Sequence, residues 1–166
     1  AIGSPMTKPA PKFPASRDET AELYVQGYRD NIAAAWATVD PAALAAAARM
    51  LKACFEADRL LYACGNGGSA AIANHLLCDF HKGIQTGTTL RPRVVSLSAH
   101  LELITAIAND IAYEECFAYQ LRTMARPGDV LMTVSSSGNS ENIVRAAQWA
   151  KANGVGTIAL TGFAGG

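Results

Sequence analysis

Short apolar runs alternate with longer amphipathic segments along most of this chain. Apolar runs of about six residues, rich in branched side chains and bounded by turn residues, predict β-strands. These runs are 59–64, 93–98, 130–135 and 156–162. Longer segments with apolar residues at helical spacing predict helices over 19–38, 41–57, 69–83, 100–125 and 140–154. Strands that alternate with helices predict a parallel sheet covered on both faces.

Several of the predicted helices carry further signals. The segment 19–38 is predicted to be amphipathic, whereas the alanine-rich segment 41–57 has apolar residues on most sides, as expected of a helix buried between neighbours. Gly83 and Gly154 are expected to end the helices before them. The segment 100–125 is predicted to be two helices.

Length and composition limit the possible classes of protein. The chain has 166 residues, enough for one domain, and its 14 basic and 14 acidic residues give no basic excess for direct nucleic-acid binding. It contains no apolar stretch of roughly 20 residues that could cross a membrane. We expect residues 1–17 to be a tag remnant and flexible N-terminus, and residues 18–166 to form a single domain.

The cysteines indicate the cellular compartment. Their spacings include no CxxC pair, and each lies in an apolar pattern, so we expect buried free thiols in a reducing cytoplasm. The cysteines are Cys54, Cys64, Cys78 and Cys116.

Three of the predicted strands end in polar turns that contain glycine, GNGGS, SSSGNS and TGFAGG. Ligands of open parallel sheets bind beyond the carboxyl ends of the strands, so we expect the chemistry there. The serine turn precedes a helix, whose N-terminus offers N–H donors and a positive dipole end. Hydroxyls in this turn could surround a phosphate, or one residue could simply cap the helix. They belong to Ser135, Ser136, Ser137 and Ser140.

Two further pairs are candidates for chemistry. His75 and Asp79 lie four residues apart on a predicted helix, which places both on one face. They are either two metal ligands, with Asp79 also able to move a proton, or a polar pair on a helix surface. Asn109 and Asp110 interrupt a helical pattern, either as a turn or as a polar lining of the site.

The order of these motifs resembles a known family. GNGGSA, His75, SLS, TAIAND, YEECF, RPGDVL, SSSGNSENI and IALTG follow one another as in the sugar isomerase (SIS) domain, and within it the phosphoheptose isomerases. The resemblance covers roughly residues 20–166. It implies a flavodoxin-like three-layer αβα sandwich with a five-stranded parallel sheet, assembled as a homotetramer with active sites at subunit interfaces.

The resemblance also implies roles for particular residues. The phosphate-binding serines of the family fall on the serine turn and its zinc-binding histidine on His75. The family's glutamate, a zinc ligand and proton-transfer base, falls on Asp79. The positions implied to bind substrate are Asn66, Gly67, Gly68, Ser69, Asp79, Asn109, Asp110, Ser135, Ser136, Ser137 and Ser140.

This sequence departs from the family pattern in two ways. Asp79 is one methylene shorter than the family's glutamate. The family's last strand and its C-terminal helix, which supplies a glutamine and a histidine to the zinc site, would lie beyond Gly166. We therefore expect the C-terminal strand and helix to be missing from the chain as given.

The resemblance implies an enzyme of carbohydrate metabolism. The expected reaction converts sedoheptulose 7-phosphate to a heptose 7-phosphate through an enediol, for lipopolysaccharide or capsule precursors, with zinc as cofactor. The alternative is a non-catalytic SIS protein that binds a phosphosugar or associates with a replication initiator. In either case we expect a cytoplasmic protein.

Overall fold

The computed structural model describes residues 20–163 and 165, in two compact units that comprise residues 1–44 and 45–166. The first unit contains helix α1 (Ala21–Ala37), which begins where the hydroxyl of Thr20 accepts a hydrogen bond from the Leu23 amide at 3.3 Å. This helix confirms the prediction for 19–38, and it buries none of its residues. The predicted tag remnant and flexible N-terminus, 1–17, lies outside the described residues.

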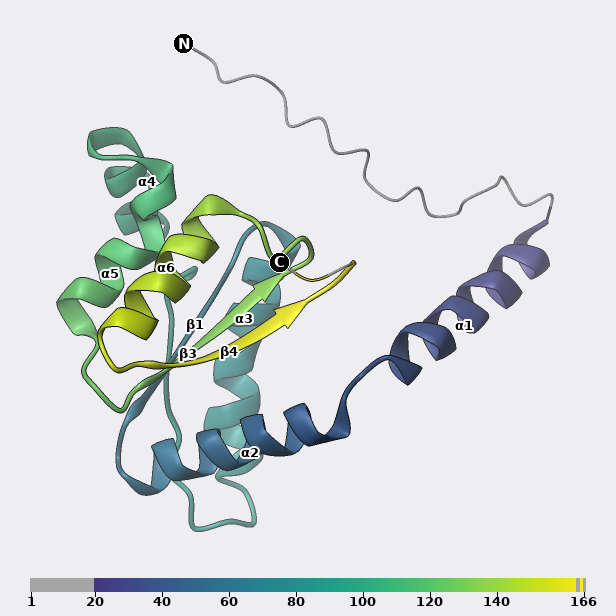
Figure 1. The fold of residues 1–166 in the computed structure, drawn as a ribbon, viewed down its shortest axis with the longest axis horizontal. Coiled ribbons are helices and arrows are strands. Elements are labelled where there is room, and N and C mark those ends of the chain that lie inside the picture. Colours follow the sequence, from purple (N-terminus) through teal and green to yellow (C-terminus); the bar gives the residue numbers. More distant parts are fainter. Residues whose placement is uncertain (1–19, 164, 166) are drawn as a thin grey trace. The chain divides into compact units, whose positions relative to one another are not determined.

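The second unit is built on a parallel sheet (Figure 1). Its strands lie in the order β2-β1-β3-β4, and each neighbouring pair is parallel. The predicted strands are confirmed to within two residues at each end. They are β1 (Leu60–Gly65), β2 (Arg93–Ser96), β3 (Val130–Ser135) and β4 (Gly156–Thr161).

Helices cover both faces of this sheet (Figure 1). One face packs against α4 (Leu101–Asp110), α5 (Cys116–Met124) and α6 (Glu141–Ala152). The other face packs against α3 (Gly68–Cys78), the π-helix η1 (Asp79–Ile84) and the end of α2 (Pro41–Glu56). The α/β sandwich is therefore confirmed.

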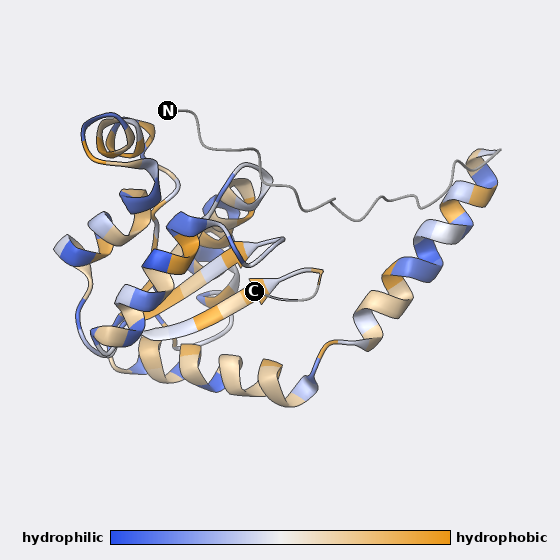
Figure 2. Ribbon diagram, turned by 45° about the horizontal axis from the view of Figure 1, so that its top comes forward, coloured by the Kyte–Doolittle hydropathy of each residue, from blue (hydrophilic) through white to orange (hydrophobic). Residues whose placement is uncertain are grey.

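The alternation of side chains along each strand supplies both cores. In β1, Leu61 packs with the α2 and α3 side while its neighbour Tyr62 packs with the α5 and α6 side. In β3, Met132 and Leu131 divide in the same way. All four are almost fully buried. Strands buried on both faces explain why the sequence shows continuous apolar runs instead of an alternating pattern (Figure 2).

Two helix predictions need correction. The α2 helix is not buried between neighbours, because its only buried residues are Cys54 and Phe55. The helix after GNGGS does not end at Gly83, because α3 continues as a π-helix through Ile84. The segment 100–125 divides as predicted, because α4 ends at Asp110 and Ile111 and Ala112 lead into a 3₁₀ turn, η2 (Tyr113–Glu115).

Other details agree with the sequence. Gly154 lies just past the end of α6 with φ +70°, the left-handed geometry of a helix C-terminus. Among the described residues, no helix combines the length and hydropathy that a membrane span requires.

Candidate functional site

The order of the strands determines where a ligand can bind. The chain passes from β1 outward to β2, then returns to the other side of β1 to form β3 and β4. The connection after β1 leads to one side of the sheet and the connection after β3 leads to the other. Between two such connections a crevice opens at the carboxyl ends of β1 and β3. A pocket of about 210 Å³ lies there. Its lining comes from the turns after β1, β3 and β4 and comprises Asn66, Ser69, Val134, Ser135, Ser136, Ser137, Ser140 and Phe163.

The structure thus brings together six of the residues predicted to bind substrate. All four serines of the turn after β3 line this pocket, as do Asn66 and Ser69 from the GNGGS turn. The lining contains no charged side chain. An anion in this pocket would therefore be held by hydroxyls, N–H groups and the N-terminal end of α6.

The hydrogen bonds of the serine turn separate two kinds of serine. Ser135 Oγ accepts from the Gly138 amide and Ser137 Oγ from the Asn139 amide, both at 3.2 Å, which shapes the turn. Within the described residues, the hydroxyls of Ser136 and Ser140 form no hydrogen bond. These two hydroxyls are free to contact a ligand.

Simple helix capping does not account for the serines. Ser140 occupies the N-cap position of α6, yet its side chain makes no capping hydrogen bond. Instead, Oδ1 of Asn142 accepts from the Ile143 amide at 3.0 Å. The Ile143 amide also donates to the Ser140 carbonyl at 2.9 Å, so it has a partner without the Ser140 hydroxyl, which remains available.

Two glycines shape the turn after β1 without lining the pocket. Gly67 has φ +53°, a conformation that side chains disfavour, and it precedes the first residue of α3, Gly68. Neither belongs to the lining. Gly67 follows Asn66 and Gly68 precedes Ser69, so both lie next to residues of the lining. Their predicted role as substrate contacts stays a prediction.

His75 and Asp79 form a close pair on the outside of α3. Nε2 of His75 lies 3.3 Å from Oδ1 of Asp79, and the two side chains are 70% and 59% exposed. Neither residue lines the pocket. Among the described residues, no group of three or more histidine, cysteine, aspartate or glutamate side chains could hold a metal ion. The pair offers one nitrogen and one oxygen donor, both of a kind that zinc accepts.

Asn109 and Asp110 end helix α4 and bond to each other. Asn109 Nδ2 donates to Asp110 Oδ1 at 2.7 Å, and both side chains are exposed. They lie outside the lining of the pocket. The structure therefore does not unite them with the serine turn.

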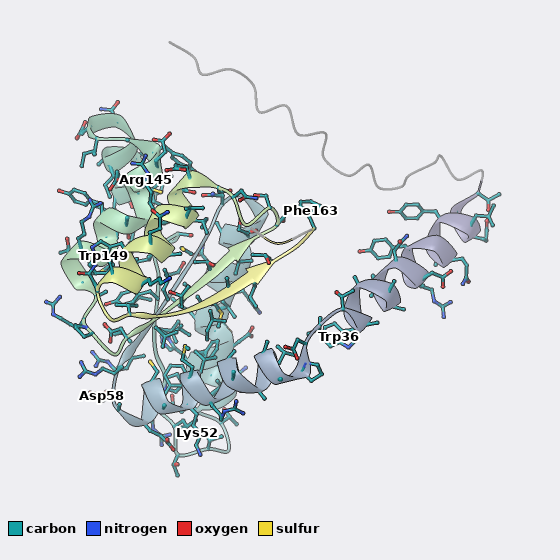
Figure 3. All side chains as sticks on the ribbon, viewed as in Figure 1. Trp36, Lys52, Asp58, Arg145, Trp149 and Phe163 are labelled. Carbon is teal, nitrogen blue, oxygen red and sulfur yellow. The ribbon has the colours of Figure 1, made fainter. Side chains whose placement is uncertain are left out.

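Three residues near the pocket were missed from the sequence as site residues. Asn142 is buried and bonds to Asn66, and Tyr113 donates to Asn66 from η2. Phe163, which Figure 3 labels, lines the pocket just after β4. Asn142 comes two residues after Ser140, and this closeness to the serine turn is a sequence signal that could have indicated it. Tyr113 and Phe163 depend on the folding of distant segments.

The cysteine prediction is correct for three residues and wrong for the fourth. All four thiols are free, and Cys54, Cys64 and Cys116 are buried. Burial raises the pKa of the Cys54 thiol to about 11 and also raises that of Cys64. Cys78 is exposed, because it lies on the outer side of α3.

Known proteins are similar to this chain in sequence and in fold. The SIS domain model matches residues 26–162. A phosphoheptose isomerase of Colwellia psychrerythraea is 40% identical over 120 residues, which are 72% of this chain and 61% of that protein. One from Shewanella sp. (strain ANA-3) is 38% identical over 126 residues, which are 76% of this chain and 64% of that protein. The chain thus spans less than two thirds of the length of these relatives.

Solved structures agree. The phosphoheptose isomerase GmhA from Neisseria gonorrhoeae superposes with a TM-score of 0.75 at 35% identity, covering 87% of this chain and 77% of that one. A phosphoheptose isomerase from Francisella tularensis gives a TM-score of 0.80 at 30% identity, covering 89% and 78%. By its sequence and its fold, this chain belongs to the SIS domain family.

Proposed function

We propose that this chain is an aldose–ketose isomerase that converts sedoheptulose 7-phosphate to a heptose 7-phosphate. The observation that carries the proposal is the uncharged, hydroxyl-lined pocket between the ends of β1 and β3, in a chain that is similar to phosphoheptose isomerases. A polar pocket at a helix N-terminus suits a phosphorylated sugar.

We assign a separate task to each of two turns of the pocket, the serine turn after β3 and the GNGGS turn after β1. Ser136 and Ser140, whose hydroxyls are free of other bonds within the described chain, donate to the phosphate together with the first amides of α6. Asn66 and Ser69 contact the sugar from the other turn. Gly67, Gly68, Asn109 and Asp110 remain candidates for further substrate contacts.

Asp79 is the proposed base. Its carboxylate removes a proton from C1 of the ketose while the C2 carbonyl oxygen takes up a proton, which gives the enediol. Return of the first proton to C2 of the enediol, with loss of the proton on the C1 oxygen, gives the aldose. The pocket lies at the start of α3, whereas Asp79 begins η1 at the far end of that helix. The sugar must therefore extend from the phosphate subsite toward Asp79, or Asp79 must act on a site of another subunit.

His75 and Asp79 are proposed as two ligands of a zinc ion. Their nitrogen and oxygen donors already converge to 3.3 Å, and their exposure leaves room for further ligands. When bound, zinc would polarise the substrate oxygens. We further propose a homotetramer in the cytoplasm that serves lipopolysaccharide or capsule synthesis.

The test is an isomerase assay on sedoheptulose 7-phosphate with the wild type and Asp79→Asn. We expect Asp79→Asn to lower turnover by about 100- to 10,000-fold while phosphosugar binding persists. Asp58→Asn makes the same chemical change just before β1, at the edge of the sheet opposite Phe163 and the carboxyl ends of the strands (Figure 3). The φ of +53° at Asp58 suits asparagine, so the turnover of this variant should match the wild type. Wild-type binding without turnover would refute the isomerase and indicate a binding protein.

A further inference from the structure

Asn66, in the lining of the pocket, and Asn142, buried behind it, form a reciprocal amide pair. Nδ2 of Asn66 donates to Oδ1 of Asn142, and Nδ2 of Asn142 donates to Oδ1 of Asn66, both at 2.9 Å. Asn66 follows β1, whereas Asn142 lies in the first turn of α6. The pair therefore joins the two turns that enclose the candidate phosphate site.

A backbone amide fixes which way these side chains face. The Ile143 N–H donates both to the Ser140 carbonyl at 2.9 Å and to the Asn142 side chain at 3.0 Å. Because an N–H can only donate, the side-chain atom that faces it is the oxygen. The nitrogen of Asn142 then faces Asn66 and Cys116, with its contact to Cys116 Sγ at 3.4 Å. Since Asn142 is only 2% exposed, water cannot compete for these contacts.

The orientation of Asn142 determines that of Asn66. Oδ1 of Asn66 accepts from Asn142 Nδ2 and from the Tyr113 hydroxyl, each at 2.9 Å, so both lone pairs are used. One N–H of Asn66 Nδ2 is taken by Asn142 Oδ1. The other N–H has no partner among the described residues, and Asn66 lines the pocket. What Asn66 offers to a ligand is thus a donor.

We propose that Asn142, supported by Tyr113, is a positioning residue that locks the Asn66 amide so that it presents an N–H to an oxygen of the bound phosphosugar. This inference rests on the proposed function for the identity of the ligand. Neither Asn142 nor Tyr113 lines the pocket, so both act through Asn66. A preoriented donor needs no reorganisation when the ligand binds.

The variant Asn142→Asp separates positioning from capping. An aspartate has the same shape, keeps an oxygen for the Ile143 N–H and places a favourable charge near the N-terminus of α6. It cannot donate to Oδ1 of Asn66, and its second oxygen would repel that atom. We expect the KM for sedoheptulose 7-phosphate to rise by about 10-fold or more with a smaller change in kcat. Tyr113→Phe, at an exposed residue, should raise KM by only a few fold.

Ile143→Val is the matched control. It trims a buried side chain next to Asn142 and lowers the melting temperature without touching the amide pair. If Asn142→Asp changes KM no more than Ile143→Val does at an equal loss of melting temperature, the role of Asn142 is structural and the proposal is overturned.

A second measurement keeps this inference separate from the proposed function. Crystal structures of the wild type and Asn142→Asp, each soaked with inorganic phosphate, report the Asn66 side chain directly. We expect Asn66 to turn away from the wild-type position in the variant, whether or not the wild type is an isomerase. An unchanged Asn66 would overturn the positioning role. Absence of wild-type turnover, by contrast, would count against the proposed function alone.

Discussion

Gly65, the last residue of β1, lies against the first turn of α3 with no room for a side chain. A Cβ at this position would come within 2.6 Å of the backbone carbon and oxygen of Ser69. Because Ser69 also lines the pocket, this close approach fixes the distance between the strand end and one wall of the candidate site. The glycine is therefore required by contact with α3, since its φ is not positive.

Replacement of Gly65 by alanine is expected to destabilise the fold. The backbone of α3 must move to admit the methyl group, at a cost of about 1–3 kcal/mol in the free energy of unfolding. Gly83→Ala is the control, because nothing lies within 4 Å of a Cβ there. Urea unfolding of both variants checks this expectation, and equal stability of Gly65→Ala and Gly83→Ala would contradict the argument from close contact.

Single residues also show how far sequence reasoning can reach. The serine turn was identifiable because four hydroxyls in six positions exceed the needs of a cap, and the structure places all four around one pocket. Asn142 and Tyr113 were missed because their importance depends on Asn66, which lies 76 and 47 positions away. No local pattern reports a hydrogen bond over such a separation.

At the scale of elements, a cluster of charges ties α5 and α6 to the 3₁₀ turn before α5. The carboxylate of Glu115 accepts from Arg122 Nη2 at 2.6 Å and from Arg145 Nη1 at 2.7 Å. Arg145, on α6, also bonds to Glu141 at 2.8 Å (Figure 3). The hydrogen bonds from Arg145 and Arg122 lower the pKa of Glu115. These hydrogen bonds therefore hold the 3₁₀ turn against both helices.

The contribution of this cluster should depend on pH. A lowered carboxyl pKa stabilises the fold above the unfolded value of about 4.3, and the stabilisation disappears as the pH falls through the folded pKa. Glu115→Gln should therefore cost about 1 kcal/mol at pH 7, a small value because both arginines are partly exposed, and almost nothing near pH 3.

Chemical denaturation of Glu115→Gln at both pH values checks the sign. Glu114→Gln removes the same charge from the neighbouring position, where the described structure contains no ion pair, and should show no such pH dependence. A stability difference for Glu115→Gln that persisted unchanged at pH 3 would contradict the ion-pair explanation.

The elements themselves followed largely from periodicity, and their exceptions have local causes. The break in 100–125 lies where it was predicted, because α4 ends with the Asn109–Asp110 pair. The α2 helix was expected to be buried because it has apolar residues on most sides. Most of these are alanines, which are compatible with every environment, so the composition could not reveal that only the end of α2 packs on the sheet.

At the scale of the whole molecule, burial divides the cysteines into two classes. Cys54, Cys64 and Cys116 belong to the two cores of the sandwich, and Cys78 lies outside them. A buried thiol with a raised pKa is neither accessible nor ionised at neutral pH, so it does not react with alkylating reagents.

We therefore expect one thiol of the native protein to react rapidly with iodoacetamide and all four to react in denaturant. Mass spectrometry of the labelled chain counts and locates them. Cys78→Ser should abolish the rapid labelling. Fast modification of Cys64 or Cys116 in the native state would show that the core around the sheet is not packed as described.

The sequence by itself determined the strands and most of the helices, the parallel α/β class, the family and the serine turn. Each of these depends on local periodicity, on turn chemistry or on the order of short motifs, which are properties of the chain before it folds. They needed no knowledge of distant contacts.

Only the tertiary structure decided which candidate residues share a site. It gathered the turns after β1 and β3 around one pocket, left His75, Asp79, Asn109 and Asp110 outside its lining, and paired Asn66 with Asn142. The physical reason is that strand order and helix packing set these distances. They bring together residues that are far apart along the chain and separate others that are close.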